Sequence, residues 1–283
     1  MLIALGAIWG ASFMFIKVAV RELEPVTLVW LRILLAAAVL VPVAFVVVGR
    51  RAIGETRAAA GPLAVMAVVN SAVPFTLLAW AETRIDSGLA AILQAAAPLF
   101  TALISLRFGD ERVAGSRLAG VVLGFLGVAL LLGAPSGGDV AAALAVVATA
   151  ACYSVAGVFA ERRLRETHPF VVGAGSMAIA AVLTAPFGLA TLPGHIPGWK
   201  ETASVLVLGT IGTGVAYMLF FAILRGAGAS RSILVTYLVP SAAVLYGVTL
   251  LGEELRPTAA AGLALILGGV ALGARRRRVA SPA

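Results

Sequence analysis

Residues 94–130 read QAAAPLFTALISLRFGDERVAGSRLAGVVLGFLGVAL, and residues 236–272 read TYLVPSAAVLYGVTLLGEELRPTAAAGLALILGGVAL. At a spacing of 142 residues the two stretches share a proline, a glutamate and a glycine-rich end, namely Pro98 and Pro240, Glu111 and Glu253, Gly120 and Gly262, and 127–130 and 269–272. Upstream the matches continue at a spacing of 144, through Arg21 and Arg165, Glu22 and Glu166, Pro25 and Pro169, and Pro42 and Pro186. The chain is therefore a duplication, with copies at 1–134 and 140–274 and a basic tail at 275–283.

The length of the repeated unit narrows the architecture. A unit of roughly 140 residues is too long for a solenoid, whose repeats run to about 20–50 residues. Internal duplications on this larger scale are typical of secondary transporters.

The composition places most of the chain in lipid. Hydrophobic residues make up 61% of it, charged residues 12%, and the mean hydropathy is +1.06. Soluble domains contain about 45–50% apolar and about 25% charged residues. A water-soluble fold could not bury this much apolar surface, so we expect a membrane protein.

The net charge of +8 does not indicate a nucleic-acid partner. The basic residues stand singly or in pairs between apolar runs, as they do in the cytoplasmic loops of membrane proteins. The single cysteine, Cys152, has no partner at metal-ligand spacing, and His168 and His195 are too few for a histidine site. We therefore expect no metal and no cofactor.

Continuous apolar runs, rather than alternating ones, favour transmembrane helices over barrel strands. The fold class is thus an all-α membrane protein. We predict ten transmembrane helices, at 2–20, 26–48, 60–80, 87–107, 117–134, 140–160, 169–190, 203–224, 230–251 and 257–274.

The distribution of Lys and Arg predicts the orientation. With the N-terminus in the cytoplasm, 15 of the 21 basic residues fall on the cytoplasmic side and 5 on the outer side, so both termini are predicted to be cytoplasmic. Each copy holds five spans, an odd number, and the second copy therefore starts on the opposite side from the first. The two five-helix repeats are predicted to be inverted, as alternating access uses them.

Two prolines predict helix breaks deep in the bilayer. Pro98 and Pro240 each lie near the middle of a span, and a proline there removes the hydrogen bond to the residue four positions back. Those residues are the polar Gln94 and Thr236. Irregular backbone at this depth is tolerated where it is buried or lines a cavity. We predict a substrate site around these four residues, with a structural kink as the alternative.

Other polar residues in the spans are candidates for the same cavity. Arg32 could bind an anionic group, pair with Glu82, or extend to the outer surface. Asn70 could add a donor and an acceptor, and Glu82 is the best candidate for a proton carrier. We expect Lys17, Glu82, Arg84 and Asp86 to form a solvated rim at the outer helix ends. The aromatic residues that could line the cavity or anchor at the interface are Trp9, Trp30, Phe75, Trp80, Tyr153, Tyr217, Tyr237 and Tyr246.

Three glycine pairs, in which the two residues are four positions apart, predict close helix contacts. They are Gly6 and Gly10, Gly120 and Gly124, and Gly269 and Gly273. Such pairs let backbones approach in the membrane, and they are compatible with an internal contact or with a homodimer.

Motifs of other protein classes are missing. Neither Lys17 nor Lys200 ends a phosphate-binding loop, so no ATP-driven pump is encoded in this chain. No hydrolase or redox motif occurs either. We expect that the protein is not an enzyme.

Several short motifs in order resemble the EamA-like branch of the drug/metabolite transporter superfamily. They are Trp9-Gly10-Ala11-Ser12-Phe13, Arg32 after Pro25, and the two series that begin at Pro98 and Pro240. Residues 151–154, ACYS, depart from the family's Trp-Gly pattern at the start of the second copy.

The resemblance implies a ten-helix, two-repeat secondary transporter of the inner membrane. Spans 5 and 10 would be peripheral, around a cavity formed by the other eight. Members of the family export amino acids, related metabolites or toxic compounds, and others move nucleotide sugars or lipid-linked sugars.

Two classes of function remain open from the sequence. The first is an exporter of small amphipathic metabolites, and the second is a non-transporting sensor or assembly subunit. A translocator of lipid-linked or nucleotide sugars is a further alternative. No span carries an unmistakable central carboxylate, so we expect facilitated or weakly proton-coupled transport.

Overall fold

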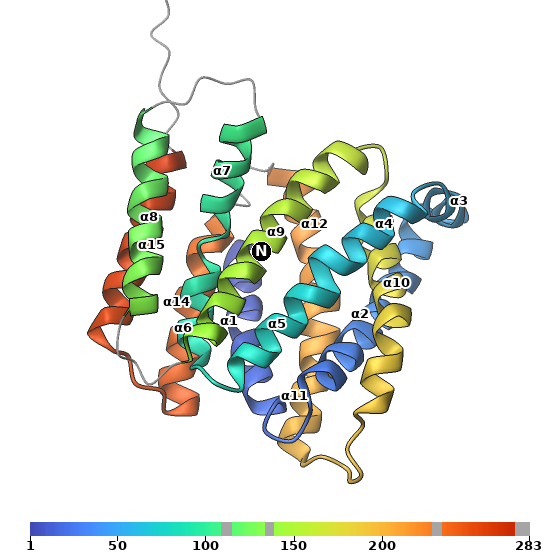
Figure 1. Ribbon diagram of the computed structural model, residues 1–283. Coiled ribbons are helices and arrows are strands. Elements are labelled where there is room, and N and C mark those ends of the chain that lie inside the picture. Colours follow the sequence, from blue (N-terminus) through green and yellow to red (C-terminus); the bar gives the residue numbers. More distant parts are fainter. Residues whose placement is uncertain (109–114, 134–138, 228–233, 275–283) are drawn as a thin grey trace, which may run out of the picture.

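The computed structural model describes residues 1–108, 115–133, 139–227 and 234–274. Within these ranges every regular element is a helix and no strand occurs. The helices pack as a bundle in which most of the long ones run between the same two ends of the molecule (Figure 1).

The first copy contains the following elements: α1 (Leu2–Ala19), α2 (Pro25–Val48), α3 (Arg51–Ala58), α4 (Ala60–Met66), the π-helix η1 (Ala67–Ala72), α5 (Val73–Glu82), α6 (Ser87–Gln94), α7 (Ala97–Phe108) and α8 (Gly115–Gly133). The second copy contains α9 (Val140–Arg163), α10 (Pro169–Ala190), α11 (Trp199–Gly209), the π-helix η2 (Thr210–Val215), α12 (Ala216–Ala227), α14 (Leu234–Tyr246), the π-helix η3 (Gly247–Leu251) and α15 (Pro257–Ala274).

The lengths of these helices bear on the ten predicted spans. Seven helical segments are long and apolar enough to cross a membrane. The segments at 118–133, 237–251 and 257–272, where we predicted spans 5, 9 and 10, are apolar but only 10–17 residues long in the part of the chain searched. The predicted membrane protein is therefore supported by seven candidate spans, whereas the count of ten helices stays a prediction, because three further segments are shorter.

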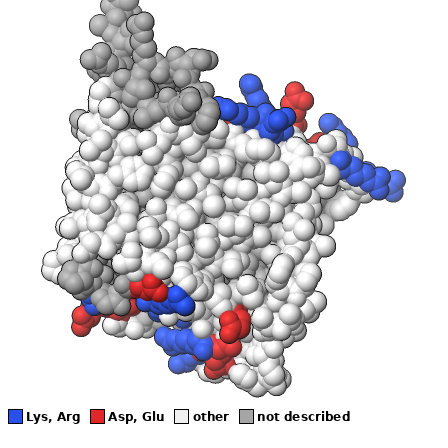
Figure 2. Space-filling model, viewed as in Figure 1, with Lys and Arg blue, Asp and Glu red and all other residues white. Residues whose placement is uncertain are grey.

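The charged side chains gather at the two ends of the bundle. Figure 2 shows one face of the molecule, with a broad uncharged band between two charged ends. We name them the Glu253 end, which carries Lys17, Glu22, Arg84, Asp139 and Glu253, and the Glu55 end, which carries Arg51, Glu55, Arg162 and His168. The uncharged band is the surface that lipid would cover.

Local sequence explains where several helices begin and end. Pro25 and Pro169 start α2 and α10, because a proline at the first helical position lacks only an N–H that would be unpaired there. Asp139 caps α9 through Oδ1, which accepts the N–H of Ala141 at 2.8 Å. Gly49, with φ of +72°, follows the end of α2 in a conformation that other residues rarely adopt.

The predicted break in span 4 is present, but the matching break in span 9 is not. Span 4 divides into α6 and α7 at Ala95 and Ala96, just before Pro98. In contrast, α14 continues through Pro240. Here α1 packs closely against α14: a Cβ at Gly10 would lie 3.0 Å from the Val239 carbonyl oxygen.

Glycines of the predicted pairs lie at close contacts between helices of the same chain. A Cβ at Gly6 would lie 2.6 Å from Leu238 Cβ, so α1 and α14 cross closely. A Cβ at Gly269 would overlap the Gly120 carbonyl and lie 2.6 Å from Gly124 N, so α8 and α15 touch through their backbones. These two helices form one edge of the bundle (Figure 1). The glycine pairs therefore give no separate support for a homodimer.

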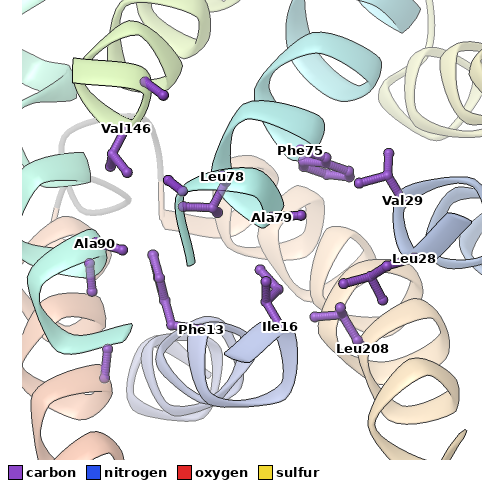
Figure 3. Packing of buried hydrophobic residues seen from close by; sticks show 14 of the residues in the cluster. Phe13, Ile16, Leu28, Val29, Phe75, Leu78, Ala79, Ala90, Val146 and Leu208 are labelled. Atoms are coloured by element: carbon purple, nitrogen blue, oxygen red, sulfur yellow. The ribbon is translucent and has the colours of Figure 1, made fainter. Parts of the chain in front are cut away.

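One hydrophobic core joins both copies. Figure 3 shows Phe13 and Ile16 of α1 facing Leu78 and Ala79 of α5. Leu28, Val29 and Phe75 join this core from the first copy, and Val146 and Leu208 from the second. The shared core holds α2 against α11 and α5 against α9, and thus places the residues of the next section.

Candidate functional site

Two π-helical segments lie at equivalent positions in the two copies. The segment η1 lies within the span Ala60–Glu82, and η2 lies within the span Trp199–Ile223. Asn70 and Thr213 occupy matching places in them, at a spacing of 143 residues. π-Helical turns are rare and are frequent at functional sites, because they turn side chains and carbonyls out of the regular α pattern. Here each brings a polar side chain to the middle of an apolar span.

Arg32 of α2 points into the protein and reaches the second copy. Its Nε donates a 2.9 Å hydrogen bond to Thr213 Oγ1, and its guanidinium carbon lies 3.8 Å from the centre of the Phe75 ring. The residue is only 7% exposed, which rules out the alternative that it extends to the outer surface. Among the residues that the structure describes, its two terminal amino groups have no hydrogen-bond partner.

Thr213 is itself held in place. Its hydroxyl donates to the Leu208 carbonyl at 2.9 Å, which leaves the oxygen lone pairs to accept from Arg32. Thr213 is fully buried. A buried threonine with this orientation fixes the guanidinium plane, so the free amino groups of Arg32 have a defined direction.

Asn70 and Tyr217 form the second polar pair. Asn70 Nδ2 donates to the Tyr217 hydroxyl at 2.9 Å, which links η1 to α12. The hydroxyls of Tyr153 and Tyr217 lie within electrostatic range of Arg32. We name these five residues, Arg32, Asn70, Tyr153, Thr213 and Tyr217, the central polar cluster.

Aromatic rings surround one side of this cluster. Tyr217 and Phe221 meet edge to face at 5.8 Å, and Phe221 meets Phe170 at 5.7 Å. Trp9 of α1 packs on Phe220, with 5.6 Å between the ring centres. Both Trp9 and Tyr217 thus pack on aromatic rings of α12.

The four residues predicted around the proline breaks are not joined to this cluster by a described hydrogen bond. Gln94 is half-buried, and its Oε1 is buried without a partner within the described ranges. Near Pro98 the break is stabilised from the second copy, where Ser154 Oγ donates to the Ala97 carbonyl at 2.6 Å. Pro240 is buried inside α14. The side chain of Thr236 lies outside the described residues.

The predicted solvated rim is correct for two of its members and wrong for the others. Arg84 and Asp86 are exposed, whereas Glu82 is 0% exposed and Lys17 is half-buried. Lys17 Nζ donates to the carbonyls of Glu82 and Ile85, at 2.7 and 2.8 Å, and so satisfies the carboxyl end of α5. This contact draws the end of α5 inward.

The Glu82 side chain has no direct partner in the described part of the chain. Neither carboxyl oxygen has a hydrogen bond, and Lys17, Arg32 and Glu253 are its electrostatic neighbours. The predicted direct pairing with Arg32 is not formed as an ion pair. A buried carboxyl without a partner is a group that a proton or a ligand could satisfy.

Two pockets open at the Glu253 end. They have volumes of about 190 and about 320 Å³, and Asp86, Glu253, Glu254 and Arg256 line both of them. No predicted substrate-site residue lines either pocket.

Sequence reasoning missed Thr213 and the two π-helical turns. One signal was available: the 143-residue spacing that aligns Asn70 with Thr213, between the repeat spacings of 142 and 144. A π-turn itself has no sharp sequence signature, because it depends on the packing of the neighbouring helices.

The uncharged band, the membrane-length helices and the central polar cluster together define a polytopic helical membrane protein of the transporter kind. The chain belongs to the EamA-like transporter family, whose model matches residues 1–133 and 140–274.

The names of two similar proteins agree with this class. The chain is 30% identical over 210 residues to a probable terminal-alkyne amino-acid exporter of Streptantibioticus cattleyicolor, covering 71% of this chain and 68% of that protein. It is 26% identical over 293 residues to a probable amino-acid metabolite efflux pump of Salmonella typhimurium, covering 96% and 94%. A solved crystal structure superposes with a TM-score of 0.67 at 25% identity, over 96% of this chain and 94% of the other.

Proposed function

We propose that this transporter is a secondary exporter of small amphipathic metabolites that carry a carboxylate, such as amino acids. The observation that carries the proposal is the buried Arg32, whose terminal amino groups have no protein partner in the described ranges while Thr213 holds its Nε. A guanidinium held in this way matches a carboxylate through two parallel hydrogen bonds. The two relatives named above as exporters of amino acids or their metabolites support the same class of substrate.

The other members of the central polar cluster would bind the rest of the substrate. The Asn70 amide and the hydroxyls of Tyr153 and Tyr217 can accept from or donate to an amino or hydroxyl group. The rings of Phe75 and Tyr217 would cover its apolar part. Gln94, Pro98, Thr236, Pro240 and Trp9 complete the proposal as the lining toward spans 4, 9 and 1, and the unpartnered Gln94 oxygen supports this placement.

The transport cycle we propose is alternating access between two inverted five-helix repeats, in the inner membrane and with both termini in the cytoplasm. Support comes from the duplicated sequence and from the π-turns at matching positions. Each repeat contributes one side of the cluster, because Arg32 and Asn70 come from the first and Thr213 and Tyr217 from the second.

The test is uptake of labelled amino acids into proteoliposomes, with Arg32→Gln as the variant. Loss of a hydrogen bond to a charged group costs about 1.5–3 kcal/mol, which weakens apparent affinity roughly 10- to 150-fold. Arg84→Gln is the matched control, because Arg84 is an exposed arginine over the Trp80 ring.

Four outcomes decide between the candidate functions. Flux that falls in Arg32→Gln and not in Arg84→Gln supports carboxylate transport. Equal flux in both variants contradicts the assigned site. No flux of any amino acid in the parent protein would favour the non-transporting subunit, and flux of a lipid-linked or nucleotide sugar would favour a translocator.

A further inference from the structure

At the Glu253 end, the N-terminus of α6, a helix of the first copy, contacts the carboxylate of Glu253 in the second copy. Glu253 Oε1 accepts the backbone N–H of Ser87 at 2.8 Å, and Oε2 accepts that of Gly88 at 3.0 Å. These are the first two residues of α6. The first N–H groups of a helix have no partner within it and attract negative charge. Glu253 therefore ties the two copies together by two charge-assisted hydrogen bonds.

The segment that carries Glu253 is shaped for this contact. Gly252 has φ of +71°, a left-handed conformation that favours glycine. The Glu253 N–H then donates to the Gly247 carbonyl at 3.0 Å. A Cβ at Gly247 would overlap Glu253 Oε2. The carboxylate can thus reach α6 only because residue 247 has no side chain.

A second carboxylate, that of Asp86, adjoins the same backbone donors in the sequence. Asp86 is the N-cap residue of α6 and has the extended backbone of a capping residue, with φ of −67° and ψ of 146°, yet its side chain makes no capping hydrogen bond. An N-cap aspartate ordinarily accepts the N–H of the second or third helical residue. The second is Gly88, whose N–H is bonded to Glu253. Asp86 is exposed instead.

There is space for the two carboxylates to exchange. Both Asp86 and Glu253 line the two pockets of about 190 and about 320 Å³. Lys17 and Arg256 line the larger pocket and offer positive charge to a displaced Glu253. The unpartnered carboxyl of Glu82 lies within electrostatic range of Glu253.

We propose that Glu253 is the gate residue of this end of the transporter, and that Asp86 replaces it on the N-terminus of α6 when the two copies move apart. The inference rests on the proposed function, because it takes the repeats to separate during transport. With Glu253 bound, the end is closed across the repeat interface. With Asp86 bound, the N–H of Gly88 keeps a partner, so opening does not leave a buried donor unpaired.

The experiment measures access from the Glu253 end with a cysteine reporter. Cys152→Ala removes the single native thiol. Ser71→Cys then places one in η1, where the side chain is 0% exposed and its oxygen has no partner in the described structure. The rate of labelling by a membrane-impermeant maleimide is measured in vesicles of both orientations, without substrate.

Two variants should open the gate, and each has a matched control. Glu253→Gln keeps one neutral acceptor, whose hydrogen bond has about half the strength of a charge-assisted one, and its amide nitrogen cannot accept the second N–H, so the labelling rate should rise about 5-fold. Gly247→Ala keeps Glu253 and displaces its carboxylate, with the same expected rise. Glu254→Gln changes the neighbouring charge, and Gly157→Ala adds a Cβ where nothing lies within 4 Å. Both controls should label at the parental rate.

The exchange itself is tested by Asp86→Ala, which removes the second carboxylate and should lower the labelling rate below the parental one. The proposal is overturned if Glu253→Gln and Gly247→Ala both label at the parental rate, if Glu254→Gln labels as fast as Glu253→Gln, or if Asp86→Ala labels faster than the parent. Because no substrate is present, these results do not depend on the flux measured for Arg32→Gln. Failure of the gate and failure of the proposed function can therefore be told apart.

Discussion

Single residues carry most of the polar chemistry inside this apolar protein. An arginine at the centre of a span costs about 2.5–3.5 kcal/mol on insertion scales. Arg32 offsets part of this cost through Thr213 and through the face of Phe75, since a desolvated cation over an aromatic ring gains about 2 kcal/mol. Under the proposed function, the remaining donors of the guanidinium would bind the carboxylate of the substrate.

A substitution of Glu82 tests whether this buried carboxyl carries a proton. If protons are coupled to transport, the buried carboxyl must bind and release one, so Glu82→Gln should abolish the dependence of flux on a pH gradient. Flux without a gradient should stay within about 2-fold of the parent, because Gln keeps the volume of the side chain. The measurement is proteoliposome flux with and without an imposed gradient. Strong gradient dependence that survives the substitution would show that another group carries the proton.

At the scale of elements, the two proline-containing spans behave differently. In span 4 the chain leaves helical geometry at Ala95 and Ala96, and Pro98 is the second residue of the new helix α7. In span 9 the helix α14 passes through Pro240 without a break. The same residue type therefore has two structural outcomes, although both segments contact a neighbouring helix: Ser154 of α9 bonds the Ala97 carbonyl, and α1 packs closely on α14.

This difference predicts unequal effects of removing the prolines. Pro98→Ala should let α6 and α7 join into one helix and slow transport more than it changes substrate affinity. Pro240→Ala should have a smaller effect on the rate, because α14 is already continuous. Initial rates and apparent affinities of both variants are compared at equal membrane expression. A larger loss of rate in Pro240→Ala would assign the mobile element to span 9 instead.

The contact between α8 and α15 gives a prediction about stability. A Cβ at Gly269 meets backbone atoms of Gly120 and Gly124, which cannot move aside as a flexible side chain can. Gly269→Ala should therefore destabilise the protein by about 1–3 kcal/mol, the usual cost of overpacking. Gly133→Ala is the control, because a Cβ there meets nothing within 4 Å. Thermal unfolding in detergent compares them, and equal midpoints would mean that the two helices separate easily.

For the whole molecule, the sequence predicted the membrane class, the helical fold and the family, because composition and duplicated motifs depend on the chain alone. It also pointed to Arg32, Asn70 and Tyr217 individually. The joining of Arg32 to Thr213 and of Asn70 to Tyr217 could not be predicted, since each pair is separated by more than a hundred residues and depends on how the copies pack. The burial of Glu82 could not be predicted for the same reason, because it depends on how distant segments pack, including the contact of Lys17 with the end of α5.

The last prediction concerns the orientation of the molecule in the membrane. The basic residues Arg51, Arg162 and Arg163 lie toward the Glu55 end, and the acidic Glu22, Glu82 and Glu253 lie toward the other. Cytoplasmic loops are enriched in Lys and Arg, so the Glu55 end and both termini should face the cytoplasm. Reporter fusions at the C-terminus and within 135–139 should report opposite sides. A C-terminus on the outer side would contradict the charge argument. Two reporters on the same side would contradict an odd number of spans in the second copy, and with it the inverted repeat on which alternating access depends.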